Sequence, residues 1–322
     1  MKAIVTTKYG PPDVLEFKDV AKPEPKENEV LIKIHAASVN AYDWHLLTAD
    51  IPLVRLMGGG LLKPQNPIPG ADIAGQVEAV GSSVTQFKPG DEVFGDISKG
   101  GFAEYACAPE NKLALKPLNL SFEQAAAVPM AGITALQGLR DEGKIQPGQK
   151  VLINGASGGV GTFALQIAKM FGAEVTAVCS TRNLEQALSL GADHVIDYTK
   201  EDFTRSGQQY ELIFAANGYH PLSAYQRALT PQGIYIMAGG TAAQIFQSML
   251  LGPLMSKKGG KTMGGVAAKI SQKDLVTLKE LLEAGKIVPV IDQRFPLSEA
   301  AEALRYLGAG HARGKVIITV IE

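Results

Sequence analysis

Cysteine is scarce in this 322-residue chain, and the two that occur, Cys107 and Cys179, lie far apart in the sequence. Two cysteines cannot form a multi-disulfide framework, nor can they supply a zinc site built mainly from thiolates. A secretion signal is also lacking, because the first residues contain no apolar core of the roughly 7–15 residues that such signals need. We therefore expect a reducing, cytoplasmic compartment.

An excess of charge of either sign is lacking too. Thirty-one basic and 32 acidic residues give a formal net charge of −1, so no global field would attract nucleic acid or an anionic membrane surface. No run approaches the ~20 apolar residues of a membrane-spanning helix. The partners that we expect are therefore small molecules, with no nucleic acid and no spanning membrane segment.

The order of predicted elements indicates an α/β protein of two domains, since a typical domain has about 150 residues. Up to about residue 120, short β-like runs alternate with turn residues and prolines, which is typical of a mostly antiparallel β unit. From Val151 onward, apolar strands alternate with helices, and this favours a doubly wound parallel sheet. Strands near residues 287–290 and 315–320 are predicted to close the chain.

A glycine-rich turn stands between the apolar strand at residues 151–153 and the helix that follows it. Glycines would let the amides at the helix N-terminus approach a pyrophosphate, and would let the helix pack closely on the strand. The alternative, glycines that serve packing alone, is disfavoured by the regular strand–helix–strand context. The predicted dinucleotide-binding residues of this turn are Gly155, Ser157, Gly158, Gly159, Val160 and Gly161.

The residues after the second strand indicate which dinucleotide is bound. A carboxylate there would hold a ribose 2′-hydroxyl, but Glu174 comes too early for that role and Glu185 lies in the next helix. Ser180 and Arg182 instead offer a hydroxyl and a fixed cation, which suit a 2′-phosphate. We therefore predict NADPH rather than NADH. The predicted binding residues of this segment are Ser180, Arg182 and Asn183.

Further motifs are spread over nearly the whole chain. They are Met1-Lys2-Ala3-Ile4-Val5 with Tyr9-Gly10, Asn40-x-x-Asp43-Trp44, Pro69-Gly70-Ala71-Asp72-x-Ala74-Gly75, Val80-Gly81, Phe87-Lys88-x-Gly90-Asp91-x-Val93, Gly101-Phe102-Ala103-Glu104-Tyr105, Ala131-Gly132-x-Thr134-Ala135 and Gly314-Lys315-Val316. Together with the glycine turn, this set resembles the zinc-free quinone oxidoreductase branch of the medium-chain dehydrogenases/reductases. The resemblance implies a GroES-like substrate domain of residues 1–126 and 269–322 around a Rossmann domain of residues 127–268.

The resemblance also implies chemistry without a metal. Zinc alcohol dehydrogenases of the same superfamily carry a cysteine where Asn40 aligns and a Gly-His-Glu where Gly70-Ala71-Asp72 aligns. Those ligands are missing here, and a catalytic zinc needs about three protein ligands at once, which His35, His45 or Asp72 alone cannot supply. We expect hydrogen-bond donors to polarise the substrate oxygen instead.

By the same resemblance, Asn40, Asp43 and Thr134 lie near the nicotinamide and its ribose, and Tyr198 contacts the adenosine phosphate. Asn217 and Gly239 follow later strands, at the edge of the sheet that faces the cofactor. The candidate catalytic residues are Asn40, Tyr42, His45 and Thr134. The cofactor-binding candidates beyond the glycine turn and the segment after the second strand are Asp43, Tyr198, Asn217, Gly239 and, more weakly, Lys315.

Several of these side chains have a structural alternative. Trp44, the only tryptophan, could belong to the core, and His45 could be a surface histidine rather than a donor. Tyr198 would pack equally well at the end of a strand, and Thr134 would commonly bond its own helical turn. The weaker candidates are His220 and the cluster of Lys257, Lys258 and Lys261, which suits a solvated loop or a phosphate contact.

Two uncharged apolar segments, residues 56–62 and 245–255, favour a lipophilic substrate or, equally, a dimer or domain interface. The function that we predict is zinc-independent hydride transfer from NADPH to a quinone or an α,β-unsaturated carbonyl, in a homodimer. Two alternatives stay open: a cofactor-binding sensor or crystallin-like module with little turnover, and an alcohol dehydrogenase.

Overall fold

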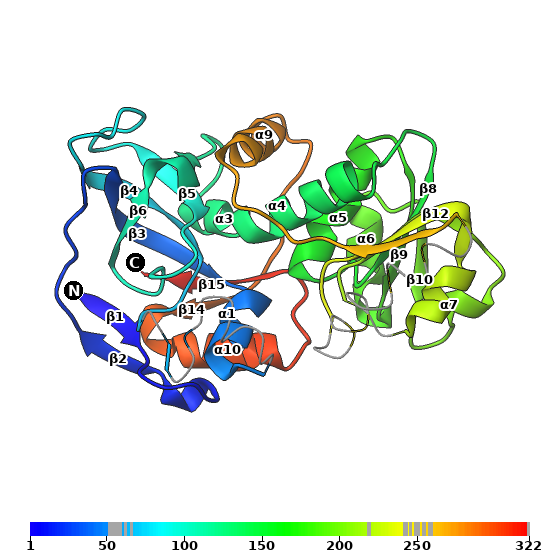
Figure 1. Ribbon diagram of the computed structural model, residues 1–322, viewed down its shortest axis with the longest axis horizontal. Helices are drawn as coiled ribbons and strands as arrows, with labels where there is room; N and C mark the ends of the chain where they lie inside the picture. The colour runs from blue at the N-terminus through cyan, green and yellow to red at the C-terminus, as the bar shows by residue number, and fades with distance from the viewer. Residues whose placement is uncertain are drawn as a thin grey trace. The chain divides into compact units, whose positions relative to one another are not determined.

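The computed structural model of this protein describes residues 1–50, 60, 63–64, 67–217, 220–240, 244, 247, 252, 256 and 260–320 (Figure 1). Its contacts divide the chain into two compact units. Unit 1 consists of Met1–Met130, Ile270–Gly285 and Pro289–Glu322, and unit 2 of Ala131–Lys269 and Lys286–Val288. Within the described residues, no helix has the length and the apolar character that a membrane span requires.

A mostly antiparallel sheet forms the centre of unit 1. Its strand order is β14-β15-β3-β4-β5-β7, with β6 also paired to β3, and only the β14–β15 pair is parallel. The strands are β3 (Glu29–Val39), β4 (Asp72–Val80), β5 (Glu92–Asp96), β6 (Tyr105–Pro109), β7 (Leu113–Leu115), β14 (Ile291–Pro296) and β15 (Lys315–Thr319). A separate antiparallel pair joins β1 (Lys2–Val5) to β2 (Glu16–Asp19).

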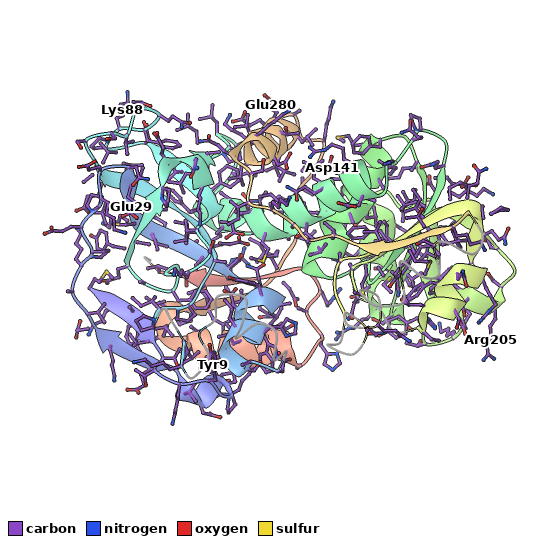
Figure 2. All side chains as sticks on the ribbon, in the orientation of Figure 1. Tyr9, Glu29, Lys88, Asp141, Arg205 and Glu280 are labelled. Carbon is purple, nitrogen blue, oxygen red and sulfur yellow. The ribbon has the colours of Figure 1, made fainter. Side chains whose placement is uncertain are left out.

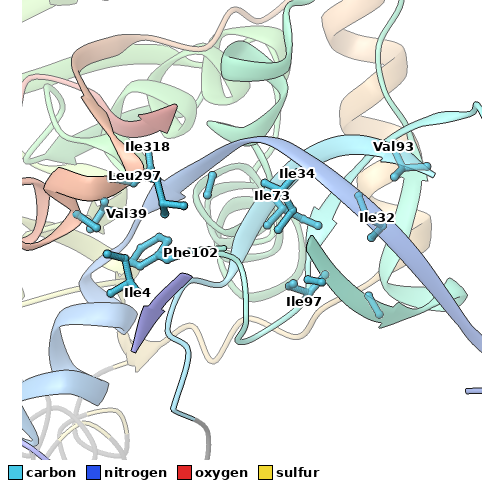
Figure 3. Close-up of a cluster of buried hydrophobic side chains, with 14 of the residues drawn as sticks. Ile4, Ile32, Ile34, Val39, Ile73, Val93, Ile97, Phe102, Leu297 and Ile318 are labelled. Carbon is cyan, nitrogen blue, oxygen red and sulfur yellow. The ribbon is translucent and has the colours of Figure 1, made fainter. Parts of the chain in front are cut away.

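The core of unit 1 gathers aliphatic side chains from strands that are far apart in the sequence. Ile34 of β3, Ile73 of β4 and Ile318 of β15 belong to one buried cluster, together with Phe102 (Figure 3). Each fully buried side chain of this size stabilises the fold by about 1.5–3 kcal/mol. The helices of unit 1 are α1 (Ala41–Thr48), α3 (Phe122–Ala126), α9 (Gln272–Glu283) and α10 (Ala300–Gly308).

A parallel sheet forms the centre of unit 2, with strand order β10-β9-β8-β11-β12-β13. The strands are β8 (Lys150–Asn154), β9 (Glu174–Cys179), β10 (His194–Asp197), β11 (Tyr210–Ala215), β12 (Leu229–Met237) and β13 (Thr262–Gly265). The helices are α5 (Gly159–Met170), α6 (Leu184–Ser189) and α7 (Leu222–Arg227), with α4 (Pro129–Gln137) beginning in unit 1. The predicted α/β fold class, with one parallel and one mostly antiparallel sheet, is confirmed.

The strand order of unit 2 also places a topological switch point. From β8 the chain moves outward through β9 to β10, and then returns to the other side of β8 at β11. The carboxyl ends of β8, β9 and β11 therefore border the place where open parallel sheets bind ligands. Charged side chains of both signs lie elsewhere on the surface, such as Lys88 and Glu280 of unit 1 and Arg205 of unit 2 (Figure 2).

The strand predicted at residues 287–290 is wrong, because β14 begins only at Ile291. The backbone of Val288 instead bonds a side chain of α5: its N–H donates to Gln166 Oε1 (2.8 Å), and its carbonyl accepts from Gln166 Nε2 (3.0 Å). Unit 1 also reaches Met130, beyond the boundary predicted at residue 126. There the Met130 N–H donates to Asp72 Oδ1 of β4 (3.1 Å).

Candidate cofactor and active site

The turn between β8 and α5 has a backbone that requires glycine. Gly155 has a φ of +79°, which side chains rarely allow. A Cβ on Gly161 would lie 2.1 Å from the carbonyl oxygen of Gly155, so a larger residue would push the turn off the helix. Gly158 is the N-cap of α5, and the N–H groups of the next three residues, Gly159 to Gly161, precede the helical hydrogen-bond pattern. This cradle fits a pyrophosphate.

A buried amide holds the turn to the next strand of the sheet. Asn154, the last residue of β8, donates from Nδ2 to the carbonyl oxygen of Asn217 (3.0 Å) and to the hydroxyl of Tyr225 (2.7 Å). Gly239 follows β12, and a Cβ there would lie 2.5 Å from the carbonyl oxygen of Ala216. Asn217 thus borders the glycine turn at the carboxyl edge, and Gly239 packs against Ala216, the residue before it. Sequence reasoning missed Asn154 and Tyr225, although a polar residue closing a buried apolar strand is a visible signal.

The segment after β9 brings the predicted NADPH residues together. Asn183 is buried, at 4% exposed, and its Nδ2 donates to Ser157 Oγ (3.0 Å) and to Ser180 Oγ (3.2 Å). Arg182 is exposed, and Tyr198 is 51% exposed with its N–H bonded to the carbonyl of Cys179 (3.1 Å). Ser180 and Arg182 therefore follow the end of β9, and the backbone of Tyr198 is bonded to the last residue of the same strand.

A carboxylate next to this segment is bonded within the protein. Asp197, at the end of β10, accepts hydrogen bonds from the Thr181 hydroxyl and from the hydroxyl (2.6 Å) and N–H (3.0 Å) of Thr199. The bond from Thr181 and those from Thr199 hold the pKa of Asp197 well below its usual range. Because its lone pairs are used in this way, Asp197 anchors the Thr181–Asn183 turn.

Unit 1 carries a second polar cluster, which we call the lysine cluster: Ser38, Asn40, Asp72 and Lys315. The Lys315 ammonium, 3% exposed, donates to Asn40 Oδ1 and lies 3.4 Å from Asp72 Oδ2. Asn40 Nδ2 donates to Asp72 Oδ2 (3.0 Å), as does the Ser38 hydroxyl (3.1 Å). Burial raises the pKa of Asp72 and lowers that of Lys315, and the attraction between them opposes both shifts.

Asp43 adjoins this cluster on α1. Its Oδ2 accepts from the Asn40 N–H (2.9 Å), which closes the first turn of the helix, whereas its buried Oδ1 has no partner. Burial raises the pKa of Asp43 to about 7, and the charge of Asp72 adds to the shift. Lys315, predicted as a cofactor ligand, lies inside unit 1 with Asn40 and Asp72.

The other candidates on α1 differ in exposure. Tyr42 is 41% exposed, and partial burial beside Asp43 raises its pKa. His45 Nδ1 lies 2.8 Å from Asp50 Oδ1. Trp44 packs on the core of unit 1, where a Cβ on Gly308 would meet its ring at 2.3 Å, so the core alternative fits it.

The remaining candidates lie in unit 2. Thr134 is buried in α4, and His220 packs edge-on against Phe203 and Tyr225. Lys261 donates to the Gln226 carbonyl (2.7 Å). Lys257, Lys258 and most of the two apolar segments, residues 56–62 and 245–255, lie outside the described residues.

No group of three or more histidine, cysteine, aspartate or glutamate side chains suited to a metal ion occurs in the described part of the chain. At the position where zinc relatives carry a cysteine, the Asn40 amide is bonded to Lys315 and Asp72. The expectation of zinc-independent chemistry stays a prediction.

Two family models match the chain: an alcohol dehydrogenase GroES-like domain over residues 26–118 and a zinc-binding dehydrogenase over residues 190–318. The chloroplast envelope quinone oxidoreductase homolog of Arabidopsis thaliana is 36% identical, over 94% of this chain and 93% of that protein. This chain belongs to the quinone oxidoreductase branch of the medium-chain dehydrogenases/reductases.

Two further members of the superfamily extend the comparison. The chloroplastic NADPH-dependent alkenal/one oxidoreductase of A. thaliana is 35% identical, over 99% of this chain and 79% of that protein. The structure of the quinone oxidoreductase from Coxiella burnetii superimposes with a TM-score of 0.88 at 32% identity, over 100% of this chain and 99% of that chain.

The prediction of a cytoplasmic compartment is contradicted by these relatives, because both plant proteins are named as chloroplast proteins. That prediction rested on few cysteines and on the absence of a secretion signal. Both features are equally compatible with the interior of an organelle, where thiols can also stay reduced, so they do not separate the two compartments.

Proposed function

We propose that this protein reduces quinones and α,β-unsaturated carbonyls with NADPH, without a metal ion. The observation that carries the proposal is the carboxyl edge of unit 2, where a glycine cradle for a pyrophosphate adjoins Ser157, Ser180 and Arg182. The similarity to an NADPH-dependent alkenal/one oxidoreductase and to a quinone oxidoreductase supports the same cofactor and substrate class.

The residues of unit 2 would bind and orient the cofactor. The first-turn amides of α5 would hold the pyrophosphate, and Arg182 with the two serine hydroxyls would hold the 2′-phosphate. Asn217 and Gly239 would border the remainder of the dinucleotide at the ends of β11 and β12. The bound NADPH supplies a hydride, which with one proton from solvent or a side chain reduces an enone to a saturated carbonyl and leaves NADP⁺.

Each unit offers hydrogen-bond donors of the kind that stabilise charge on a substrate oxygen. Tyr42 is partly exposed on α1 and carries a hydroxyl donor, and His45 follows one turn later. Thr134 offers a hydroxyl in α4. The Asn40 amide already serves Asp72 and Lys315, so we assign it to holding the start of α1 in place. Conjugation suits such a site, because it spreads the charge onto an oxygen that hydrogen bonds can stabilise.

A substrate panel tests this function. NADPH oxidation is followed with quinones, enones, saturated aldehydes and ketones, and the reverse reaction with alcohols, each with zinc added and with a chelator. We expect turnover of quinones or enones that the chelator leaves unchanged. Activity confined to saturated carbonyls or alcohols and abolished by chelator would restore the zinc dehydrogenase alternative, and NADPH binding without turnover would favour the sensor or crystallin-like module.

We also propose a homodimer as the working form, since uncharged apolar segments are typical of subunit interfaces. Light scattering on the purified protein measures its mass in solution. A mass of one chain at micromolar concentration would exclude a stable dimer.

A further inference from the structure

One buried amide in unit 2 links two hydroxyls that are separate in the sequence. Asn183 follows β9, Ser180 begins the same turn, and Ser157 belongs to the glycine turn before α5. The Asn183 Nδ2 lies 3.0 Å from Ser157 Oγ and 3.2 Å from Ser180 Oγ. The amide is buried, whereas both serines are partly exposed. A single side chain therefore holds two surface hydroxyls side by side.

The usual structural role of an asparagine at this position does not account for the contact. Asn183 is the N-cap of α6, where an asparagine side chain ordinarily accepts a hydrogen bond from an amide of the first turn. Its side chain makes no such cap bond here. Ser180, the N-cap of the preceding turn, makes none either. Neither side chain caps a helix. Instead, Asn183 is bonded to Ser180 and to Ser157.

The direction of these bonds decides what the hydroxyls can do. A serine hydroxyl has one hydrogen to donate and two lone pairs to accept. Because the Asn183 amide donates to both oxygens, each hydroxyl keeps its own hydrogen for another partner. The partners best suited to two neighbouring O–H donors are the oxygens of a phosphate, since hydrogen bonds to a charged acceptor are roughly twice as strong as neutral ones.

We propose that Asn183 is a positioning residue of the NADPH site, whose amide orients the hydroxyls of Ser157 and Ser180 as paired donors for the 2′-phosphate. This inference rests on the proposed function, because it assumes that the edge binds NADPH. It replaces the direct cofactor contact that the sequence suggested for Asn183. Selection of NADPH then depends on two oriented neutral donors as well as on the exposed cation of Arg182.

The experiment compares full-length variants by calorimetric titration with NADPH, NADH and 2′,5′-ADP, which carries the 2′-phosphate but no nicotinamide. In Asn183→Ala we expect a loss of roughly 10-fold in affinity for NADPH and for 2′,5′-ADP, as for one weakened charged hydrogen bond. NADH affinity should change by less than about 3-fold. Asn183→Asp should lose more, because its carboxylate can only accept, which turns both hydroxyl hydrogens inward, and its charge repels the phosphate.

A coupling measurement shows whether Asn183 acts through the serines. In a Ser157→Ala/Ser180→Ala background there is no hydroxyl to orient, so the further change Asn183→Ala should cost little additional NADPH affinity. The matched control is Asn119→Ala in unit 1, which also removes one amide donor, to the Leu282 carbonyl (2.9 Å), and should leave all three affinities unchanged. Thermal unfolding of each variant identifies any that fails to fold.

The proposal is overturned if Asn183→Ala weakens NADPH and NADH equally, or if its cost is undiminished in the double-serine background. Should Asn183→Ala not fold, the single serine variants decide alone, since each must weaken NADPH more than NADH. Wild-type protein that binds neither NADPH nor 2′,5′-ADP would overturn both this proposal and the proposed function. Binding without turnover would overturn the proposed function only.

Discussion

The two polar clusters of this protein, one in each unit, use buried side chains in opposite ways. In unit 2 the buried group is a neutral amide, Asn183, whose hydrogen bonds lead to partly exposed hydroxyls. In unit 1 the buried groups are charges, Lys315 and Asp72, whose partners are buried as well. A satisfied neutral amide costs little to bury, whereas buried charges are tolerated only as a paired set.

Because of this difference, substitutions in the two clusters should have different effects. Changes in the unit 2 cluster should alter what the protein binds and leave its stability nearly intact, because partly exposed hydroxyls can bond water instead. Changes in the lysine cluster should lower stability first, because an unpaired charge would remain in an apolar surrounding.

The largest effect is expected where the backbone itself is the binding group. In Gly161→Val the side chain would collide with the Gly155 carbonyl oxygen, 2.1 Å from its Cβ, and displace the turn. We expect NADPH affinity to fall by more than about 100-fold in a calorimetric titration. Gly158→Ala is the matched control, because its Cβ would lie 3.7 Å from the same oxygen and φ is −78°. Equal losses in the two variants would refute the steric account.

Lys315→Met removes the cation of the lysine cluster. Asp72 then keeps its amide and hydroxyl donors but loses its buried counter-charge, and Asn40 Oδ1 loses its donor. Breaking a buried ion pair costs about 3–5 kcal/mol of unfolding free energy. Lys279→Met, which breaks the partly exposed i,i+4 pair with Glu283, should cost only about 0.3–0.5 kcal/mol. Urea denaturation measures both, and similar costs would remove the contrast between the two clusters.

The buried carboxyl of Asp43 makes stability depend on pH. Its folded pKa of about 7 lies above the ordinary 3.8, so the folded chain holds a proton that the unfolded chain releases. The stabilising contribution is full below pH 3.8 and is lost as pH rises through 7, at up to about 1.4 kcal/mol per pH unit. Asp72, Asp96 and Lys315 face this group.

Asp43→Asn keeps an oxygen to accept from the Asn40 N–H but cannot titrate. Between about pH 4 and pH 7, the free energy of unfolding should fall less steeply with pH than in wild type, by the contribution of about one titrating proton. At pH 8 the variant should be more stable than wild type. Urea denaturation across this range measures the slope. An unchanged slope would mean that Asp43 is ionised in the folded protein throughout.

Arg182→Glu should change cofactor preference and little else. The exposed guanidinium is replaced by a charge that repels the 2′-phosphate. We expect the ratio of NADPH to NADH affinity to fall roughly 10-fold, equivalent to about 1.4 kcal/mol, with unfolding unchanged. Equal losses of affinity for NADPH and NADH would contradict the assignment of Arg182 to the 2′-phosphate.

Local patterns predicted much of unit 2. The spacing of the glycines in the turn is required because Gly161 packs on the Gly155 carbonyl. Such a close contact can be predicted from the sequence, since it restricts these positions to glycine. The parallel sheet could also be predicted from the sequence, because strands that are covered on both faces are continuously apolar.

Contacts between side chains that are far apart in the sequence could not be predicted from local patterns. Nothing near Lys315 in the sequence indicates that its ammonium reaches Asn40, 275 positions away. Asn183 suggested a ligand contact by its place after β9, but its bond to Ser157 depends on how two turns meet. The apolar run at residues 287–290 predicts a strand, because nothing in it reveals that Gln166 of α5 bonds the Val288 backbone.

The transfer of hydride from NADPH to the β-carbon of an enone can be followed with labelled cofactor. NADPH carrying deuterium at nicotinamide C4 is incubated with the protein, an enone and a chelator, and the product is analysed by mass spectrometry and NMR. We expect a saturated carbonyl with deuterium at the β-carbon. Deuterium on the former carbonyl carbon of an allylic alcohol, or no transfer from either face of the labelled cofactor, would contradict it.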